Sequence, residues 1–93
     1  MGVVWDEAKR AANLRKHGVD FAEIEAFEWE KAVLVEDRRR DYGERRRLAY
    51  GLIAERVYVV VFADRDPDIR VISLRKANRR EVRRYEKEAR LAS

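Results

Sequence analysis

A chain of 93 residues is long enough for one domain only, and its 22 lysines and arginines against 18 acidic residues give a net charge of +4. The absence of cysteine excludes disulfide scaffolds and zinc sites with thiolate ligands. With no apolar run near the roughly 20 residues of a membrane span and no secretory signal pattern, residues 1–93 are expected to form a single cytoplasmic domain.

The N-terminal third is predicted to form a short strand and two helices. The apolar run from Val3 to Trp5 favours a strand, and Asp6 is placed to cap a helix over residues 7–16. Asp20 and Glu23 then have the capping-box spacing of a second helix. The apolar stripe of that helix consists of Phe21, Ile24 and Phe27.

The remainder is predicted to form four strands and a closing helix. Apolar and β-branched residues indicate strands over residues 32–36, 46–53, 56–63 and 69–75. The middle two strands are joined by a short hairpin turn at Ala54 and Glu55. Asn78 and Glu81 again have capping-box spacing, here for a helix that runs to about Leu91. The inward stripe of this last helix consists of Val82, Tyr85 and Ala89.

This order of elements is typical of an α+β domain with a small antiparallel sheet, two N-terminal helices and one C-terminal helix. We expect the first two helices to cover one face of the sheet. The last helix is expected to cover an edge or part of that same face, which leaves the opposite face open for a ligand. Alternation in the last strand places Arg75 on the same face as Ile69 and Val71.

The C-terminal segment is strongly basic. Residues 70–93 carry nine lysines and arginines against three acidic residues, a local net charge of +6 that suits a polyanion. Arg75 and Lys76 lie where the last strand meets the helix, and Arg79 and Arg80 follow in its first turn, where free backbone N–H groups also favour an anion. A solvated helix face would carry the same charges. Because the cations repel one another unless an anion lies among them, we expect this cluster to bind phosphate.

Two further basic groups are candidates. His17, the only histidine, ends the first predicted helix beside Lys16, where the helix dipole favours the protonated imidazole. It either interacts with the last carbonyl groups of the helix or, because imidazole titrates near neutrality, transfers protons. In the run from Arg45 to Arg47, alternation sends Arg46 to the opposite face from its two neighbours.

Other chemistries lack their residues. The four glycines are isolated, so no glycine-rich phosphate loop is present. A single histidine without suitably spaced acidic residues argues against a metal site. We therefore expect neither a metal nor a cofactor.

Two motifs lie near the two ends of the chain. The first consists of Trp5-Asp6-Glu7, Asn13, Lys16-His17-Gly18-Val19 and Phe21. The second consists of Ile72 to Glu81 followed by Tyr85-Glu86. Together they resemble the motifs of the BrnT family of bacterial toxins. The resemblance covers about residues 3–88 in the right order, although residues 36–47 add little to it.

The resemblance implies a RelE-like ribonuclease fold and a type II toxin that cleaves RNA and blocks translation. It also implies neutralisation by a cognate antitoxin, BrnA, which carries a ribbon-helix-helix domain. The two would form a heterotetramer that reaches operator DNA only through the antitoxin, and no membrane partner is implied.

RNA cleavage without a metal uses the 2′-OH of the RNA as the nucleophile on the adjacent phosphorus. The enzyme must take a proton from that hydroxyl, stabilise negative charge on the phosphate and protonate the leaving 5′-oxygen. We assign the phosphate clamp to Arg75 and Arg79 and the acid–base role to His17. The residues expected to contact flanking RNA phosphates are Lys16, Arg46, Lys76, Arg80 and Arg83.

A second interpretation is a non-catalytic binding module. In that case the basic residues hold a nucleic acid or an acidic protein partner, and no bond is broken. The acidic residues between Glu23 and Glu30 would then form another docking surface. The sequence separates the two interpretations poorly, because both require the same arginines.

Overall fold

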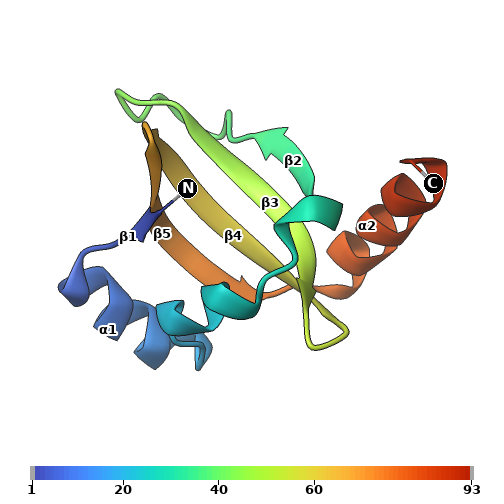
Figure 1. The fold of residues 1–93 in the computed structure, drawn as a ribbon, viewed down its shortest axis with the longest axis horizontal. Helices are drawn as coiled ribbons and strands as arrows, with labels where there is room; N and C mark the ends of the chain where they lie inside the picture. The colour runs from blue at the N-terminus through green and yellow to red at the C-terminus, as the bar shows by residue number, and fades with distance from the viewer. Residues whose placement is uncertain (1, 93) are drawn as a thin grey trace.

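The computed structural model describes residues 2–92, which form a five-stranded sheet flanked by helical segments (Figure 1). The strands are β1 (Val3–Val4), β2 (Val33–Glu36), β3 (Arg46–Ile53), β4 (Arg56–Arg65) and β5 (Asp68–Lys76). Their order across the sheet is β1-β5-β4-β3-β2, and every neighbouring pair is antiparallel except β1 with β5. The predicted α+β fold with a mainly antiparallel sheet is thus confirmed.

The helical segments are α1 (Glu7–His17), the 3-10 helices η1 (Phe21–Ala26) and η2 (Trp29–Lys31), and α2 (Arg79–Ala92). Helix α1 begins where Asp6 accepts hydrogen bonds from two backbone N–H groups of the first turn. It ends at Gly18, which has a φ of 71° and donates its N–H to the Leu14 carbonyl at 2.9 Å. None of the helices within residues 2–92 combines the length and the apolar character that a membrane crossing requires.

The second predicted helix is replaced by two short 3-10 segments. The predicted capping box forms, because Asp20 accepts from the Ala22 N–H and Glu23 accepts from the Asp20 N–H, each at 3.0 Å. Three residues per turn is the 3-10 period, so the regular three-residue spacing of the apolar side chains aligns them on one side of such a helix. All three are buried against the sheet: Phe21, Ile24 and Phe27.

One face of the sheet is sealed by this N-terminal segment, and we call it the packed face. Its core joins the buried residues of η1 to alternate residues of β4, namely Tyr58, Val60 and Phe62. Trp29 packs edge-on against Phe62, with 5.5 Å between ring centroids. On β3, Gly51 admits the Phe27 ring so closely that an added Cβ would lie 2.5 Å from Phe27 Cζ.

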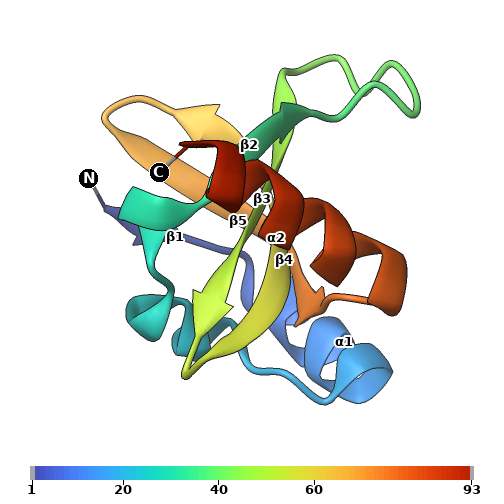
Figure 2. The same cartoon turned by 90° about the vertical axis from the view of Figure 1, so that its right-hand side faces the viewer.

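The opposite face, which carries Arg46, Arg70 and Arg75, is called the arginine face. Helix α2 lies on this face, and Figure 2 shows it in front of the strands. The predicted stripe of α2 packs there against alternate residues of β3 and β4, namely Leu48, Tyr50, Val57, Val59 and Val61. The expectation that α2 would share a face with the N-terminal helices and leave the opposite face open was therefore wrong. The alternative expectation, that α2 covers an edge, holds in part, because α2 contacts the edge strand β2 as well as β3. Because β4 is buried on both sides, each face of the sheet needs its own cover.

A bulge in β5 changes the direction of the residues that follow it. Val61 pairs with Ser73, but Phe62 pairs with Val71, so Ile72 has no partner on β4. Leu74 consequently joins Val71 in the core of the packed face, and Arg75, which pairs with Val59, lies on the arginine face. The prediction that alternation places Arg75 on the same face as Val71 was wrong, because the bulge interrupts the alternation.

Helix α1 lies along the edge of β5 (Figure 1). Strand β1 pairs with only the first part of β5, and the buried side chain of Asn13 takes over farther along. Its Oδ1 accepts from the Leu74 N–H at 3.1 Å, and its Nδ2 donates to the Leu74 carbonyl at 2.7 Å. The side-chain amide thus satisfies the backbone groups of an edge strand, which would otherwise be open for pairing with another chain.

Candidate active site

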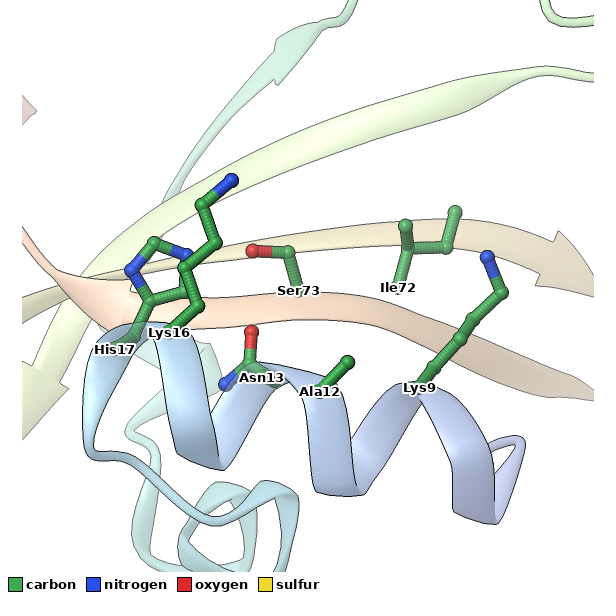
Figure 3. Close-up of a pocket in the computed structure, with 7 residues that line it drawn as sticks. All are labelled: Lys9, Ala12, Asn13, Lys16, His17, Ile72 and Ser73. Carbon is green, nitrogen blue, oxygen red and sulfur yellow. The ribbon is translucent and has the colours of Figure 1, made fainter.

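The C-terminal end of α1 borders a small pocket against β5. The pocket has a volume of about 200 Å³ and is lined by Lys9, Ala12, Asn13, Lys16, His17, Ile72 and Ser73. Figure 3 shows the side chains of Lys16 and His17 rising from the last turn of α1 on the same side as the Ser73 hydroxyl. The bulge of β5 contributes Ile72 and Ser73, so the irregular part of the strand shapes the pocket.

Arg75 forms a two-pronged ion pair with Glu81. Its Nη1 and Nη2 each donate to one carboxylate oxygen at 2.8 Å. The same Glu81 carboxylate accepts from the Asn78 N–H at 2.9 Å, while Asn78 Oδ1 accepts from the Glu81 N–H at 2.9 Å. The predicted capping box of α2 is therefore confirmed, and it also holds the Arg75 guanidinium.

This ion pair corrects the argument for an anion site. We expected the cations between Arg75 and Arg80 to repel one another unless an external anion lay among them, but Glu81 already supplies a negative charge. The hydrogen bond from Arg75 is the largest cause of the lowered pKa of Glu81. What Glu81 provides is a fixed orientation, because a guanidinium bonded through two nitrogens to one carboxylate cannot turn freely.

The pKa of His17 is lowered from its usual value of 6.5. Burial is the largest cause, followed by the positive charges of Lys16 and Arg75. The expectation that the helix C-terminus favours the protonated imidazole was wrong, because burial and two nearby cations outweigh the helix dipole. Since Arg75 acts electrostatically on His17, the fold brings these two predicted catalytic residues to one corner of the molecule, where the end of α1 meets the end of β5.

The other predicted site residues lie in two places. An exposed group surrounds the start of α2, next to the Arg75 corner, and consists of Lys76, Arg79, Arg80 and Arg83. Arg46 is on the arginine face too, but it pairs with Ala63, whereas Arg75 pairs with Val59. The four-residue offset along β4 corresponds to roughly 13 Å. Arg46 therefore lies at the far end of the face from Arg75.

The alternation predicted for the Arg45–Arg47 run is confirmed. Arg47 donates to Asp64 at 2.7 Å and lies over the Phe62 ring of the packed face. Arg46 faces the other way, with its guanidinium 4.0 Å from the ring centroid of Tyr42.

Two side chains that act on Arg75, namely Tyr50 and Arg39, were not identified from the sequence. Tyr50 lies across Val59 from Arg75 and interacts with it electrostatically, and the Arg84 guanidinium lies 5.6 Å from the Tyr50 ring centroid. Alternation from Arg46 along β3 could have placed Tyr50 on this face. Arg39 also acts electrostatically on Arg75, but it belongs to an irregular loop that has no periodic signal.

The corner combines a largely neutral imidazole with an oriented guanidinium and an exposed set of lysines and arginines. A neutral imidazole can accept a proton, and a guanidinium fork can bind the oxygens of a phosphate. Within residues 2–92, no group of three or more histidine, aspartate and glutamate side chains is arranged to hold a metal ion.

Comparisons with known proteins agree with these features. The model of a family described as the ribonuclease toxin BrnT of type II toxin–antitoxin systems matches residues 5–81, most of the chain. The chain is also similar to the ribonuclease toxin BrnT of Brucella abortus, whose crystal structure was determined at 1.1 Å resolution. The identity is 30%, the TM-score is 0.69, and the match covers 85% of this chain and 99% of the other. A comparison with curated protein sequences finds no match.

Proposed function

Because the chain belongs to the BrnT family of ribonuclease toxins of type II toxin–antitoxin systems, we propose that the corner between α1 and β5 is where it cleaves RNA. The chain is an endoribonuclease toxin, and its partners are an RNA substrate and an antitoxin. The observation that carries the proposed location is that His17 lines one pocket with Ser73, two residues before Arg75, and lies close enough to Arg75 for its charge to help lower the pKa of His17.

In this proposal His17 is the general base. Its lowered pKa leaves the imidazole neutral at pH 7, so it can accept the proton of a ribose 2′-OH. The resulting oxygen attacks the adjacent phosphorus, and the bond from phosphorus to the 5′-oxygen breaks. The departing 5′-oxygen takes a proton from a water molecule, and protonated His17 returns its proton to the solvent. The products end in a 2′,3′-cyclic phosphate and a 5′-OH. No metal or cofactor takes part.

Arg75 and Arg79 form the phosphate clamp. Glu81 uses two of the five N–H donors of Arg75, and the other donors can reach a non-bridging phosphate oxygen. Negative charge grows on that oxygen in the transition state, where a fixed cation contributes most. Arg79 supplies a second cation from the first turn of α2.

The remaining basic residues hold the rest of the RNA chain. Lys16 stands beside His17 in the last turn of α1, and residues of β5 and α2 extend the basic surface on the other side of the corner. These are Lys76, Arg80 and Arg83, and Arg46 would contact a phosphate farther away. Contacts with phosphates do not depend on the base sequence of the RNA, and the affinity that they provide falls as the salt concentration rises.

For the partner we propose a BrnA-like antitoxin with a ribbon-helix-helix domain, in a heterotetramer that binds operator DNA through the antitoxin and acts in the cytoplasm. Membership of a type II toxin–antitoxin family supports this assignment. The basic surface around α2 supports an antitoxin segment that is acidic and apolar. Co-expression with the neighbouring gene, followed by mass measurement of the purified complex, tests the partner and the stoichiometry.

Two variants test the location of the reaction. His17→Gln removes the base, and Arg75→Lys keeps the charge but removes the two-pronged pairing. Each is expected to lower the rate of RNA cleavage by roughly 10²-fold or more. Arg15→Gln, an exposed position two residues before His17, is the matched control and should cleave at the wild-type rate. Cleavage within twofold of wild type in both test variants would place the reaction elsewhere.

A further inference from the structure

A second basic pocket lies away from the proposed cleavage corner. It has a volume of about 510 Å³ and is lined by Arg39, Arg40, Tyr42 and Arg46. This volume is within the roughly 300–1,000 Å³ typical of small-molecule sites. Three guanidinium groups and one aromatic ring make up the lining, which contains no carboxylate.

Tyr42 forms a supported aromatic platform in this pocket. The guanidinium carbon of Arg46 lies 4.0 Å from its ring centroid, and that of Arg40 lies 5.9 Å away. Tyr42 also lies close enough to Asp37 to contribute to the lowered pKa of that carboxyl, although the hydrogen bond from Arg39 is the main cause. The ring is thus held mainly through its contacts with the two guanidinium groups.

A buried carboxylate orders the loop that carries these residues. The Asp37 side chain has no exposed surface, and it accepts from Arg39 Nε and Nη2 at 2.8 Å each. The Asp37 N–H donates to the Arg46 carbonyl at 2.9 Å, which ties the loop to the start of β3. The hydrogen bond from Arg39 is the main cause that lowers the pKa of Asp37 to about 2.

The pocket and the cleavage corner are connected along the arginine face. Arg46 and Arg75 lie on this face, two strands apart and roughly 13 Å from each other along the strand direction. Between them, Arg39 is close enough to act electrostatically on both Arg75 and Glu81. A flexible single strand of a few nucleotides can span this separation.

We propose that this pocket is a subsite for an unpaired nucleotide of the RNA, a few nucleotides away from the cleaved bond. The base stacks against the Tyr42–Arg46 pair, and Arg39 and Arg40 hold the adjoining phosphates. This inference rests on the proposed function. An aromatic ring packed with guanidinium groups favours RNA over an acidic peptide, because a nucleobase offers a π-face in addition to the charge of its phosphate.

The subsite is tested by the dependence of binding on RNA length. We would measure the affinity of 2′-O-methyl oligonucleotides, which lack the nucleophile, at about four and about ten nucleotides, within the range of single-stranded sites. Tyr42→Ala is expected to weaken the longer RNA about ten-fold and to leave the shorter RNA unchanged. Tyr42→Phe keeps the ring and should restore most of the lost affinity.

Two arginines of the same loop provide a matched pair. Arg40→Ala removes a lining cation and should reduce the slope of log affinity against log salt by about 0.7 for the longer RNA. Arg38→Ala makes the same change of charge at an exposed position outside the pocket lining and should leave the affinity of the longer RNA close to that of the wild type. Because Arg40 is exposed, its substitution tests the subsite even if Tyr42→Ala disturbs the loop.

The outcomes separate the subsite from the cleavage site. Equal weakening of both RNA lengths by Tyr42→Ala, or identical behaviour of Arg40→Ala and Arg38→Ala, would overturn the subsite. So would a loss of affinity for the antitoxin without a loss for RNA, since the pocket would then serve protein recognition. Failure of the cleavage proposal has a different signature: unchanged cleavage by His17→Gln and Arg75→Lys, with length-dependent binding intact.

Discussion

The two faces of the sheet are built from the same strands, but they are covered in different ways. The packed face is closed by side chains that are almost completely buried, among them Phe21 and Leu74. On the arginine face α2 covers part of the sheet, and charged side chains hold one another in place. Carboxylates there bind guanidinium groups, as Glu44 does with Arg70 at 2.6 Å and Glu81 does with Arg75 at 2.8 Å.

The contrast between apolar packing and ion pairing separates residues that mainly stabilise the fold from residues that we propose to act on RNA. A buried guanidinium nitrogen without a hydrogen-bond partner costs free energy. Of the three Nε atoms of this kind within residues 2–92, those of Arg46 and Arg70 lie on the arginine face and that of Arg47 lies on the packed face. Apolar packing, which is most extensive on the packed face, offsets such costs. We therefore expect substitutions on the packed face to change mainly stability, and substitutions on the arginine face to change mainly activity.

The largest expected effect is on the packed face. Phe21 is fully buried, so Phe21→Ala leaves a cavity and should lower the free energy of unfolding by about 3–5 kcal/mol. Urea denaturation monitored by tryptophan fluorescence measures the change. A loss below about 1 kcal/mol would show that the packed face is not the main source of stability.

Arg79→Ala tests whether a substitution on the surface around the start of α2 changes activity and leaves stability nearly unchanged. The side chain is exposed, so the free energy of unfolding should change by no more than about 0.5 kcal/mol. RNA cleavage should fall roughly 10²-fold, and ground-state RNA affinity should fall much less. Arg90→Ala, about three turns along the same helix, is the control. Equal small losses of activity in both variants would indicate a diffuse basic surface and no clamp.

A smaller loss of stability is expected at a single contact of the packed face, that between Gly51 and the Phe27 ring. Gly51→Ala places a methyl group where the Phe27 ring now lies, and it should lower the free energy of unfolding by about 1–3 kcal/mol. Phe27→Leu in the same chain removes the ring and should recover part of that loss. Thermal melting of the two single variants and the double variant measures the coupling. Additive effects would mean that the contact is not the cause.

The smallest effect concerns the dependence of cleavage on pH. Because the pKa of His17 is lowered from 6.5, its neutral form should persist at pH values somewhat below 6.5. Log(kcat/KM) should therefore be flat around neutrality and fall with decreasing pH only below that usual value, approaching tenfold per pH unit. His17→Gln should abolish this acidic limb. A limb that survives the substitution would assign the base to another group.

Local patterns predicted the elements well. Both capping boxes, the ends of α1, the Ala54–Glu55 hairpin and the bounds of β3 depend on neighbours in the chain, and the structure contains them all. What failed depends on contacts between distant segments. The bulge at Ile72 reverses Arg75, and the burial of His17 reverses its pKa shift. Neither effect has a local sequence signal.

The candidate site was predictable in part. Lys16, His17 and Arg75 were singled out by type and position, and the fold places His17 and Arg75 within electrostatic range. The Glu81 partner was expected only as a helix cap, because a contact across a strand-to-helix junction has no fixed spacing. The loop pocket around Tyr42 was missed altogether, since its order depends on a buried carboxylate in an irregular segment.

The motifs that suggested the family contain residues of two kinds. Asp6 and Asn78 cap helices, Gly18 supplies a left-handed turn, and the Trp5 ring packs edge-on against Phe21 with 6.0 Å between ring centroids. The same motifs also contain His17, Arg75 and Arg79, the three residues proposed for catalysis. The family resemblance therefore points to the fold and to the proposed site together.

The pairing of Asn13 with Leu74 has a consequence for how such a toxin is silenced by mutation. This one amide fixes the position of α1 against β5, and so the position of His17 relative to Arg75. Substitution by leucine would preserve much of the volume but leave two backbone groups of β5 unpaired. Cells selected to survive induction of the toxin should therefore accumulate changes at Asn13 as readily as at His17. Mutation can therefore inactivate such a toxin at Asn13, a residue whose hydrogen bonds go to the backbone of its own chain.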